Sequence, residues 1–231
     1  MEKSKKRLLV LSGAGMSAES GIRTFREMGG LWEEYDITEV ATPEAWSRDP
    51  HLVLRFYNER RKALFNCQPN DGHLDLARME EDFDVRIITQ NVDDLHERAG
   101  SSFVMHLHGE LKKARSSIDE SLVHELDGWE LKWGEKCKKG SQLRPHIVWF
   151  GEAVPMIPAA ISEVEKADIF LIIGTSLQVY PAASLIDYVK YDVPVFVIDP
   201  NETLGDGHGR TIIRKGASEG MKEFRQIIQS Y

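Results

Sequence analysis

The chain has 231 residues, of which 42% are hydrophobic and 29% are charged, and this composition excludes a disordered or fibrous protein. A formal net charge of −8 and an isoelectric point of about 5.5 exclude the net basic face that a nucleic-acid-binding protein needs. The two cysteines, Cys67 and Cys137, provide no disulfide framework and indicate a reducing compartment.

The N-terminal segment does not have the pattern of a targeting sequence. Residues 1–7 are basic, but the apolar run that follows, residues 8–11, is too short for the core of a signal peptide. No apolar run approaches the roughly 20 residues that a membrane span needs. We therefore expect a cytoplasmic protein that binds neither membranes nor nucleic acid.

Strand and helix patterns alternate along the first half of the chain. In chain order they predict a strand at 8–11, helix over 43–66 with a break at Asp49-Pro50, a short helix at 72–82, a strand at 85–89, and extended chain at 103–107 and around Leu111. The second half begins differently, because residues 112–143 are highly charged and carry few strand signals.

After that charged segment the alternation resumes with strands at 169–173 and 193–198 and an amphipathic helix at 218–229. Such alternation predicts an α/β fold with a Rossmann-like parallel sheet and helices on both faces. We expect residues 1–111 and 144–231 to form this domain, with a helical insertion near 30–66. Residues 112–143 would form a small inserted module.

A glycine-rich turn follows the first predicted strand. Gly13, Gly15 and Ala18 fit the pattern G-x-G-x-x-A, in which glycines let the backbone turn tightly and approach a pyrophosphate. A glycine turn after a strand is also commonly only a turn. A dehydrogenase would carry an acidic residue at the end of its second strand, whereas Glu33 and Glu34 follow an expected loop, which disfavours that class.

Two polar motifs follow the strands at 85–89 and 103–107. Gln90, Asn91 and Asp93 lie where a ligand binds in an open α/β sheet, and their amide and carboxylate groups suit a ribose and a carboxamide. The alternative is a polar turn in which Asp93 caps a helix. His108, beside Gly109, has the side chain of a general base, although a structural histidine is the commoner case.

Five segments in one order resemble the sirtuin family of NAD-dependent deacylases, from Leu8 to about Ala183. They are 13–26, with Gly13-Ala14-Gly15 and Phe25-Arg26; 89–93, Thr-Gln-Asn-Val-Asp; the His108-Gly109 pair; 148–152, Val-Trp-Phe-Gly-Glu; and 174–176, Gly-Thr-Ser. The resemblance implies an NAD-binding Rossmann-like domain and NAD-dependent removal of acyl groups from protein lysines. The products would be free lysine, nicotinamide and 2′-O-acyl-ADP-ribose.

The resemblance also implies roles for individual residues. His108 would be the general base, and Asn91 would share in catalysis. The expected NAD contacts are Gly13, Ala14, Gly15, Ala18, Glu19, Phe25, Arg26, Gln90, Asn91, Asp93, Gly174, Thr175, Ser176, Asp199 and Ala217. The expected contacts with the acylated peptide are Val148, Phe150, Gly151, Glu152 and Val179, with the 148–152 segment pairing by strand addition.

Tyr57 and Arg60 point to the identity of the acyl group. They are three residues apart on a predicted helix and so share a face, where a hydroxyl and a guanidinium can bind a carboxylate. The pair resembles the Tyr-x-x-Arg of sirtuins that remove succinyl and malonyl groups, and Ala41 resembles the small residue that widens their acyl pocket. We expect activity on both acetyl-lysine and succinyl- or malonyl-lysine.

The chain departs from the family at two places. Most sirtuins hold a structural zinc with four cysteines in two pairs, whereas the 112–143 segment contains only Cys137, with Ser116 and Ser117 where a first pair would begin. We therefore expect no bound metal. Asp199 stands near where the family often has an asparagine, and its negative charge favours NAD over NADP.

Two other functions use the same residues. A protein mono-ADP-ribosyltransferase would share every NAD contact and differ only in its acceptor. A non-catalytic NAD or ADP-ribose sensor would also keep the pocket, but it has no need of a base at His108.

Overall fold

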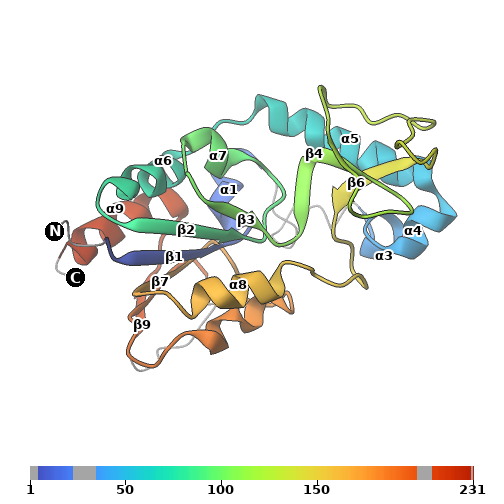
Figure 1. The fold of residues 1–231 in the computed structure, drawn as a ribbon. Helices are drawn as coiled ribbons and strands as arrows, with labels where there is room; N and C mark the ends of the chain where they lie inside the picture. Colours follow the sequence, from blue (N-terminus) through green and yellow to red (C-terminus); the bar gives the residue numbers. More distant parts are fainter. Residues whose placement is uncertain (1–4, 23–34, 202–209, 230) are drawn as a thin grey trace.

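The computed structural model describes residues 5–22, 35–201, 210–229 and 231, and its largest element is a six-stranded parallel sheet (Figure 1). The strand order is β3-β2-β1-β7-β8-β9. The strands are β1 (Arg7–Ser12), β2 (Asp84–Thr89), β3 (Val104–His106), β7 (Ile169–Ile173), β8 (Val195–Ile198) and β9 (Arg210–Ile213). The strand order reverses between β1 and β7. The expected ligand site therefore lies beyond the carboxyl ends of these two central strands.

Helices cover both faces of the parallel sheet, as the alternating pattern predicted. The helices α6 (Asp71–Arg78) and α9 (Ala217–Ile228) pack on one face, and α8 (Ile157–Val164) and the 3₁₀ segment η2 (Ala182–Tyr188) pack on the other (Figure 1). In β1, Leu8 and Val10 join the first core, whereas Leu9 and Leu11 join the second. This alternation follows from the two-residue period of a strand, and it explains why the run is apolar throughout.

A second, antiparallel sheet lies beside the first, in the order β5-β4-β6 (Figure 1). Its strands are β4 (Gly109–Ser116), β5 (Val123–Glu125) and β6 (Leu143–Ile147). Residues 112–143, which carry few strand signals in the sequence, contribute part of β4, all of β5 and the first residue of β6. Charged side chains hide the pattern, because two adjacent lysines, Lys112 and Lys113, separate the buried Leu111 and Ala114 in β4.

Three helices accompany this second sheet: α3 (Ile37–Val40), α4 (Pro43–Arg48) and α5 (Pro50–Asn66). The predicted break between α4 and α5 is confirmed. The side chain of Asp49 accepts a hydrogen bond from Leu52 N–H (2.9 Å), and Pro50 occupies the first turn of α5, where a proline loses no helical hydrogen bond.

The remaining helices are short. The helix expected at 72–82 is divided into α6 and the 3₁₀ turn η1 (Met79–Glu81). Two single-turn helices, α1 (Gly15–Ala18) and α7 (Leu95–Ala99), begin after the loops that follow β1 and β2. None of the helices that the structure describes is long and apolar enough to cross a membrane.

Candidate functional site

The loops after β1 and β7 meet where the strand order reverses. Gly13 N–H donates to Ile173 O (3.0 Å) and Gly15 N–H donates to Gly174 O (2.8 Å). A Cβ on Gly13 would lie 2.6 Å from the Thr175 Cβ, and one on Gly15 would lie 2.8 Å from the Gly174 Cα. The glycines therefore allow the two loops to pack against each other, a reason that the sequence pattern did not reveal.

A buried polar cluster lies beside these loops. Ser17 Oγ donates to Asp93 Oδ2 (3.0 Å) and accepts from Asn91 Nδ2 (3.1 Å). Gln90 Nε2 donates to Thr175 Oγ1 (3.0 Å), which ties the loop after β2 to the loop after β7. Burial raises the pKa of the Asp93 carboxyl, against the opposing hydrogen bonds from Leu95 N–H and Ser17. Asp93 does bond to the N-terminus of α7, so it has a structural role as well.

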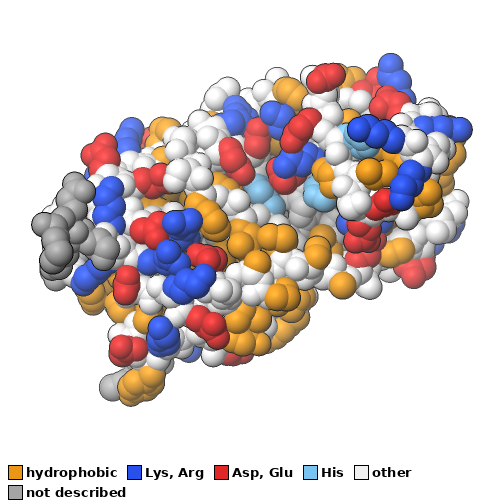
Figure 2. Space-filling view, in the orientation of Figure 1, with side chains coloured by type: hydrophobic (Ala, Val, Ile, Leu, Met, Phe, Trp, Pro, Cys, Tyr) orange, Lys and Arg blue, Asp and Glu red, His pale blue; other side chains and the backbone are white. Residues whose placement is uncertain are grey.

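His108 lies between β3 and β4, which belong to different sheets, and Figure 2 shows histidine side chains (pale blue) near the middle of the face that it draws. The Nδ1 atom of His108 is 3.0 Å from Gln90 O, and a carbonyl oxygen can only accept. Nδ1 therefore carries the proton, and the lone pair of the neutral ring lies on Nε2. Burial lowers the pKa of His108, while the hydrogen bond to Gln90 opposes this shift, so the ring is neutral at pH 7.

Within the described chain, Nε2 of His108 makes no hydrogen bond, so it is available to accept a proton. His106, by contrast, is engaged at both nitrogens, by Asn91 O (2.9 Å) and by the Glu97 carboxylate (2.7 Å). Burial alone would lower the pKa of His106, but the hydrogen bond and charge of Glu97 outweigh it and raise that pKa. His106 thus holds the Asn91 backbone and leaves His108 as the candidate base.

The segment 148–152 is attached directly to His108. Val148 N–H donates to His108 O (2.9 Å), and Phe150 N–H donates to Ala41 O (3.0 Å). The Glu152 carboxylate faces inward, where it binds Arg144 (2.6 Å), Arg115 (3.1 Å) and Trp149 N–H (2.8 Å). Phe150 and Gly151 are exposed, so the turn of this loop faces solvent. The ion pairs of Glu152 with Arg144 and Arg115 fix the end of the loop to the second sheet.

Tyr57 and Arg60 share one face of α5, as predicted from their spacing. Ala41, Tyr57 and the loop residue Trp149 belong to one apolar cluster. Burial raises the pKa of Tyr57 to about 12 and lowers the pKa of Arg60 to about 10. At neutral pH the tyrosine is therefore un-ionised and the arginine is charged, which is the state that binds a carboxylate.

Comparisons with known proteins point to one family. The model of the Sir2 family matches residues 13–181. The chain belongs to the Sir2 family. An NAD-dependent protein deacylase of Bacteroides thetaiotaomicron is 57% identical over 231 residues, covering 96% of this chain and 98% of the relative.

Solved Sir2 structures resemble the whole chain. A Sir2 homologue bound to ADP-ribose has a TM-score of 0.90 and 42% identity, covering 98% of this chain and 93% of its own. A Sir2 homologue–NAD complex has a TM-score of 0.87 and 42% identity, covering 98% of this chain and 90% of its own.

The residues of this Sir2 chain fit NAD by their chemistry. Amide, carboxylate and hydroxyl side chains of Gln90, Asn91, Asp93 and Thr175 gather after the strands where the strand order reverses: Gln90 bonds to Thr175, and Asn91 and Asp93 both bond to Ser17. Such groups can bind ribose hydroxyls and a carboxamide. Ala14 and Ala18 are half-buried beside them.

Other predicted contacts lie around this centre. The Glu19 carboxylate accepts from Ser218 N–H (3.1 Å) and so lies beside Ala217. Asp199, at the end of β8, accepts from Asn201 N–H (2.8 Å), and Ser176 is exposed after β7. Val179 is half-buried before η2, and its carbonyl accepts from Ala183 N–H (2.8 Å). The predicted contacts Phe25 and Arg26 lie outside the described residues.

The region predicted to lack zinc contains a small hydrogen-bonded cluster. The Cys137 thiol donates to Ser116 Oγ (3.2 Å), and the hydroxyls of Ser117 and Ser141 bond to each other. Among the described residues, no group of three or more His, Cys, Asp and Glu side chains is placed to hold a metal ion. Serine hydroxyls are not the thiolate or imidazole ligands that structural zinc takes, so this cluster does not fit the ion.

The sequence analysis did not single out Ser17, Arg144 or Trp149. Ser17 is fully buried between Asn91 and Asp93, and its one sequence signal is a hydroxyl inside an otherwise apolar turn. Arg144 and Trp149 act through other side chains, since Arg144 binds Glu152 of the next loop and Trp149 binds Tyr57 of α5.

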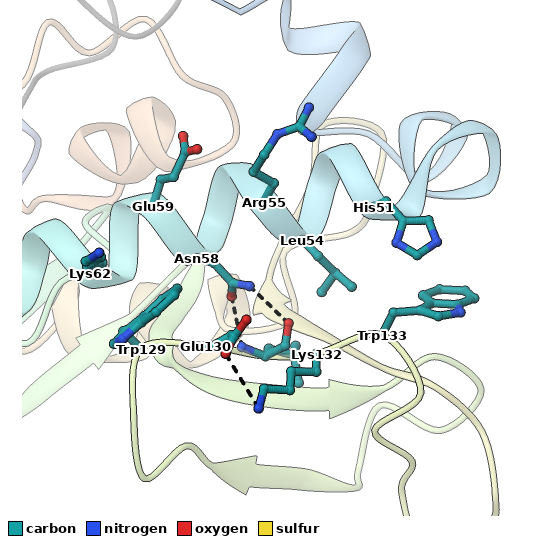
Figure 3. Close-up of a pocket in the computed structure, with 11 residues that line it drawn as sticks. His51, Leu54, Arg55, Asn58, Glu59, Lys62, Trp129, Glu130, Lys132 and Trp133 are labelled. Carbon is teal, nitrogen blue, oxygen red and sulfur yellow. Dashed lines mark hydrogen bonds and ion pairs between the residues drawn. The ribbon is translucent and has the colours of Figure 1, made fainter.

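A cavity of about 510 Å³ lies on the opposite side of α5 (Figure 3). Asn58, Lys62, Trp129 and Trp133 are among its lining residues, and Asn58 bonds to the backbone of Leu131 there. None of the predicted site residues lines it. The helix α5 therefore separates this cavity from the face that carries Tyr57 and Arg60.

Proposed function

We propose that this chain is an NAD-dependent protein-lysine deacylase that acts on acylated lysines of proteins or peptides. The observation that carries the proposal is His108, which bonds to Gln90 O through Nδ1, has no partner at Nε2 among the described residues, and bonds to Val148 through its backbone. A base, a cofactor-binding cluster and a peptide-pairing edge thus meet at one point. The name of the Bacteroides relative supports the same activity.

Each part of the site has a distinct task. When bound, NAD supplies an anomeric carbon that can be attacked and ribose hydroxyls that can receive the acyl group. Gln90, Asn91 and Asp93 bind and orient the nicotinamide ribose and its carboxamide. His108 accepts a ribose hydroxyl proton at Nε2, while its Nδ1–H stays on Gln90 O. Residues 148–152 hold the peptide by main-chain pairing.

The acyl pocket takes both a small and a carboxylate-bearing acyl group. Ala41, which is 4% exposed, leaves room beside α5, and the charged Arg60 and protonated Tyr57 bind the terminal carboxylate of succinyl or malonyl groups. An acetyl group occupies the same pocket without reaching them. Dual activity on acetyl-lysine and succinyl-lysine follows from this arrangement.

The test measures acyl loss from matched acetyl-lysine and succinyl-lysine peptides, with NAD, by mass spectrometry. We expect one nicotinamide and one acyl-ADP-ribose per lysine released, and a fall in rate of roughly 10²- to 10⁴-fold in His108→Ala. The Tyr57→Phe/Arg60→Met variant should lose succinyl activity selectively. NAD binding without acyl loss from either peptide would overturn the proposal and favour ADP-ribosyl transfer or NAD sensing.

We also propose that the protein folds without zinc. It would act in a reducing compartment such as the cytoplasm. The Ser116–Cys137 contact and the packing of Leu131 and Leu143 hold the second sheet instead. Purified protein should contain much less than one equivalent of zinc by elemental analysis, and a chelator should leave its thermal unfolding midpoint unchanged. One equivalent of zinc, or a lower midpoint with chelator, would contradict this.

A further inference from the structure

Trp149 connects the peptide loop to the acyl pocket through a single hydrogen bond. Its side chain is 2% exposed, and its Nε1–H lies 3.1 Å from the Tyr57 hydroxyl oxygen. An indole nitrogen can only donate, so the tyrosine oxygen is the acceptor in this bond. Because the Tyr57 oxygen accepts this bond, its own hydroxyl proton is directed away from Trp149 and can be donated to another group.

The Tyr57 proton is retained and needs an acceptor. Burial raises the pKa of Tyr57 to about 12, so the hydroxyl is protonated at neutral pH. Within the part of the chain that the structure describes, no group accepts this proton. A buried donor without a partner destabilises the site, and an acyl group that offers an oxygen at this point removes the penalty.

Three contacts fix the orientation of the Trp149 ring. The guanidinium carbon of Arg144 lies 3.2 Å from the centre of the ring, and the Trp46 ring packs against it at 5.8 Å. The backbone N–H of Trp149 donates to the Glu152 carboxylate, which also binds Arg144 (2.6 Å). The indole N–H is therefore held toward Tyr57 before any substrate arrives.

We propose that Trp149 is a positioning residue that makes the Tyr57 hydroxyl a hydrogen-bond donor toward the acyl group, and so favours acyl groups that end in a carboxylate. This inference rests on the proposed deacylase function and on its Tyr57 and Arg60 pocket. Arg60 attracts the carboxylate by charge, whereas Trp149 acts only through the direction of the Tyr57 hydrogen bond.

The experiment measures kcat and KM for succinyl-lysine and acetyl-lysine forms of one peptide at saturating NAD. The readout is the ratio of succinyl to acetyl kcat/KM in the wild type, Trp149→Phe, Tyr57→Phe and the double variant. We expect Trp149→Phe to lower this ratio roughly 3- to 10-fold, the effect of one hydrogen bond, mainly through the KM of the succinyl peptide. The double variant should have the ratio of Tyr57→Phe alone.

Trp133→Phe is the matched control, because its indole packs on Trp46 and His51 rather than on Trp149 or Tyr57, and this change should leave the ratio unchanged. Replacement of Trp149 by 3-benzothienylalanine keeps the two-ring shape and removes only the N–H, so it tests the bond if Trp149→Phe unfolds. It should lower the ratio as Trp149→Phe does. Thermal unfolding of each variant reports its folding.

The possible failures are distinguishable. An unchanged ratio in Trp149→Phe, or a further fall in the double variant below Tyr57→Phe, would overturn the inference and leave the deacylase function standing. An unchanged ratio in Tyr57→Phe would overturn the carboxylate pocket and the inference together. A wild type without NAD-dependent acyl loss would overturn the proposed function itself.

Discussion

At the scale of single residues, backbone carbonyls decide the chemistry of the histidines. Gln90 O receives the Nδ1 proton of His108 and leaves Nε2 as the base, whereas His106 is bound at both nitrogens. The sequence predicted His108 as the candidate base from its neighbours. It could not predict the tautomer, because the deciding carbonyl lies 18 residues earlier and meets the ring only after folding.

The acid limb of the activity profile should report the lowered pKa of His108. Because burial lowers this pKa, the ring keeps its lone pair to a pH below the ordinary 6.5 of histidine. We expect kcat/KM to stay level as the pH is lowered to about 6.5. Below the shifted pKa of His108, kcat/KM should fall about tenfold per pH unit. A midpoint at or above 6.5 would contradict the burial argument. His51→Gln, which changes an exposed histidine, should leave the profile as it is.

At the scale of elements, the parallel sheet was predictable and the antiparallel sheet was not. The runs that became β1 and β7 are apolar on both faces, so a short window of sequence is enough to identify them. β4 pairs with β6 across more than 20 residues, with an irregular register between Gly109 and Ala114. Charged side chains and distant pairing give no local signal of such a strand.

Gly174 should be far more sensitive to a side chain than Gly140. Both have positive φ, +62° and +79°, which disfavours any residue with a Cβ. A Cβ on Gly174 would also lie 2.1 Å from Met16 N, whereas one on Gly140 meets nothing within 4 Å. We expect Gly140→Ala to lower the free energy of unfolding by about 1 kcal/mol and Gly174→Ala to lower it by several times as much.

Denaturant unfolding and NAD titration of the two variants check this expectation. Gly174→Ala should also weaken NAD binding, because it separates the loops after β1 and β7, and Gly140→Ala should not. Equal losses of stability in the two variants would show that the contact between the loops adds nothing to the backbone strain.

At the scale of the whole molecule, two buried histidines make stability depend on pH. His73 and His96 are 0% and 1% exposed, and their rings meet edge to face at 4.8 Å. Burial lowers the pKa of His73 to about 4 and that of His96 well below 6.5. The unfolded chain therefore binds more protons than the folded chain below pH 6.5, and stability falls as the pH falls.

Between pH 6.5 and pH 5, His73 should reduce the free energy of unfolding by about 2 kcal/mol, and His96 should act in the same direction. His106 does not oppose this in the same window, because its raised pKa changes stability only above 6.5. Denaturant unfolding at pH 8, 6.5 and 5 measures the effect, with His51→Gln as an unchanged reference. Equal free energies at pH 6.5 and pH 5 would show that neither ring is held neutral.

The bond between Val148 N–H and His108 O places the base and the peptide edge on one continuous hydrogen-bonded ladder, which runs into the pairing of β4 and β6. The ring of His108 is bonded to Gln90 O, which belongs to the cofactor cluster on the parallel sheet. His108 therefore links the two sheets, through its backbone on one side and its side chain on the other. The alignment of the base with the acylated lysine and its distance to the ribose are then set together by one residue, and a shift of either sheet would change both.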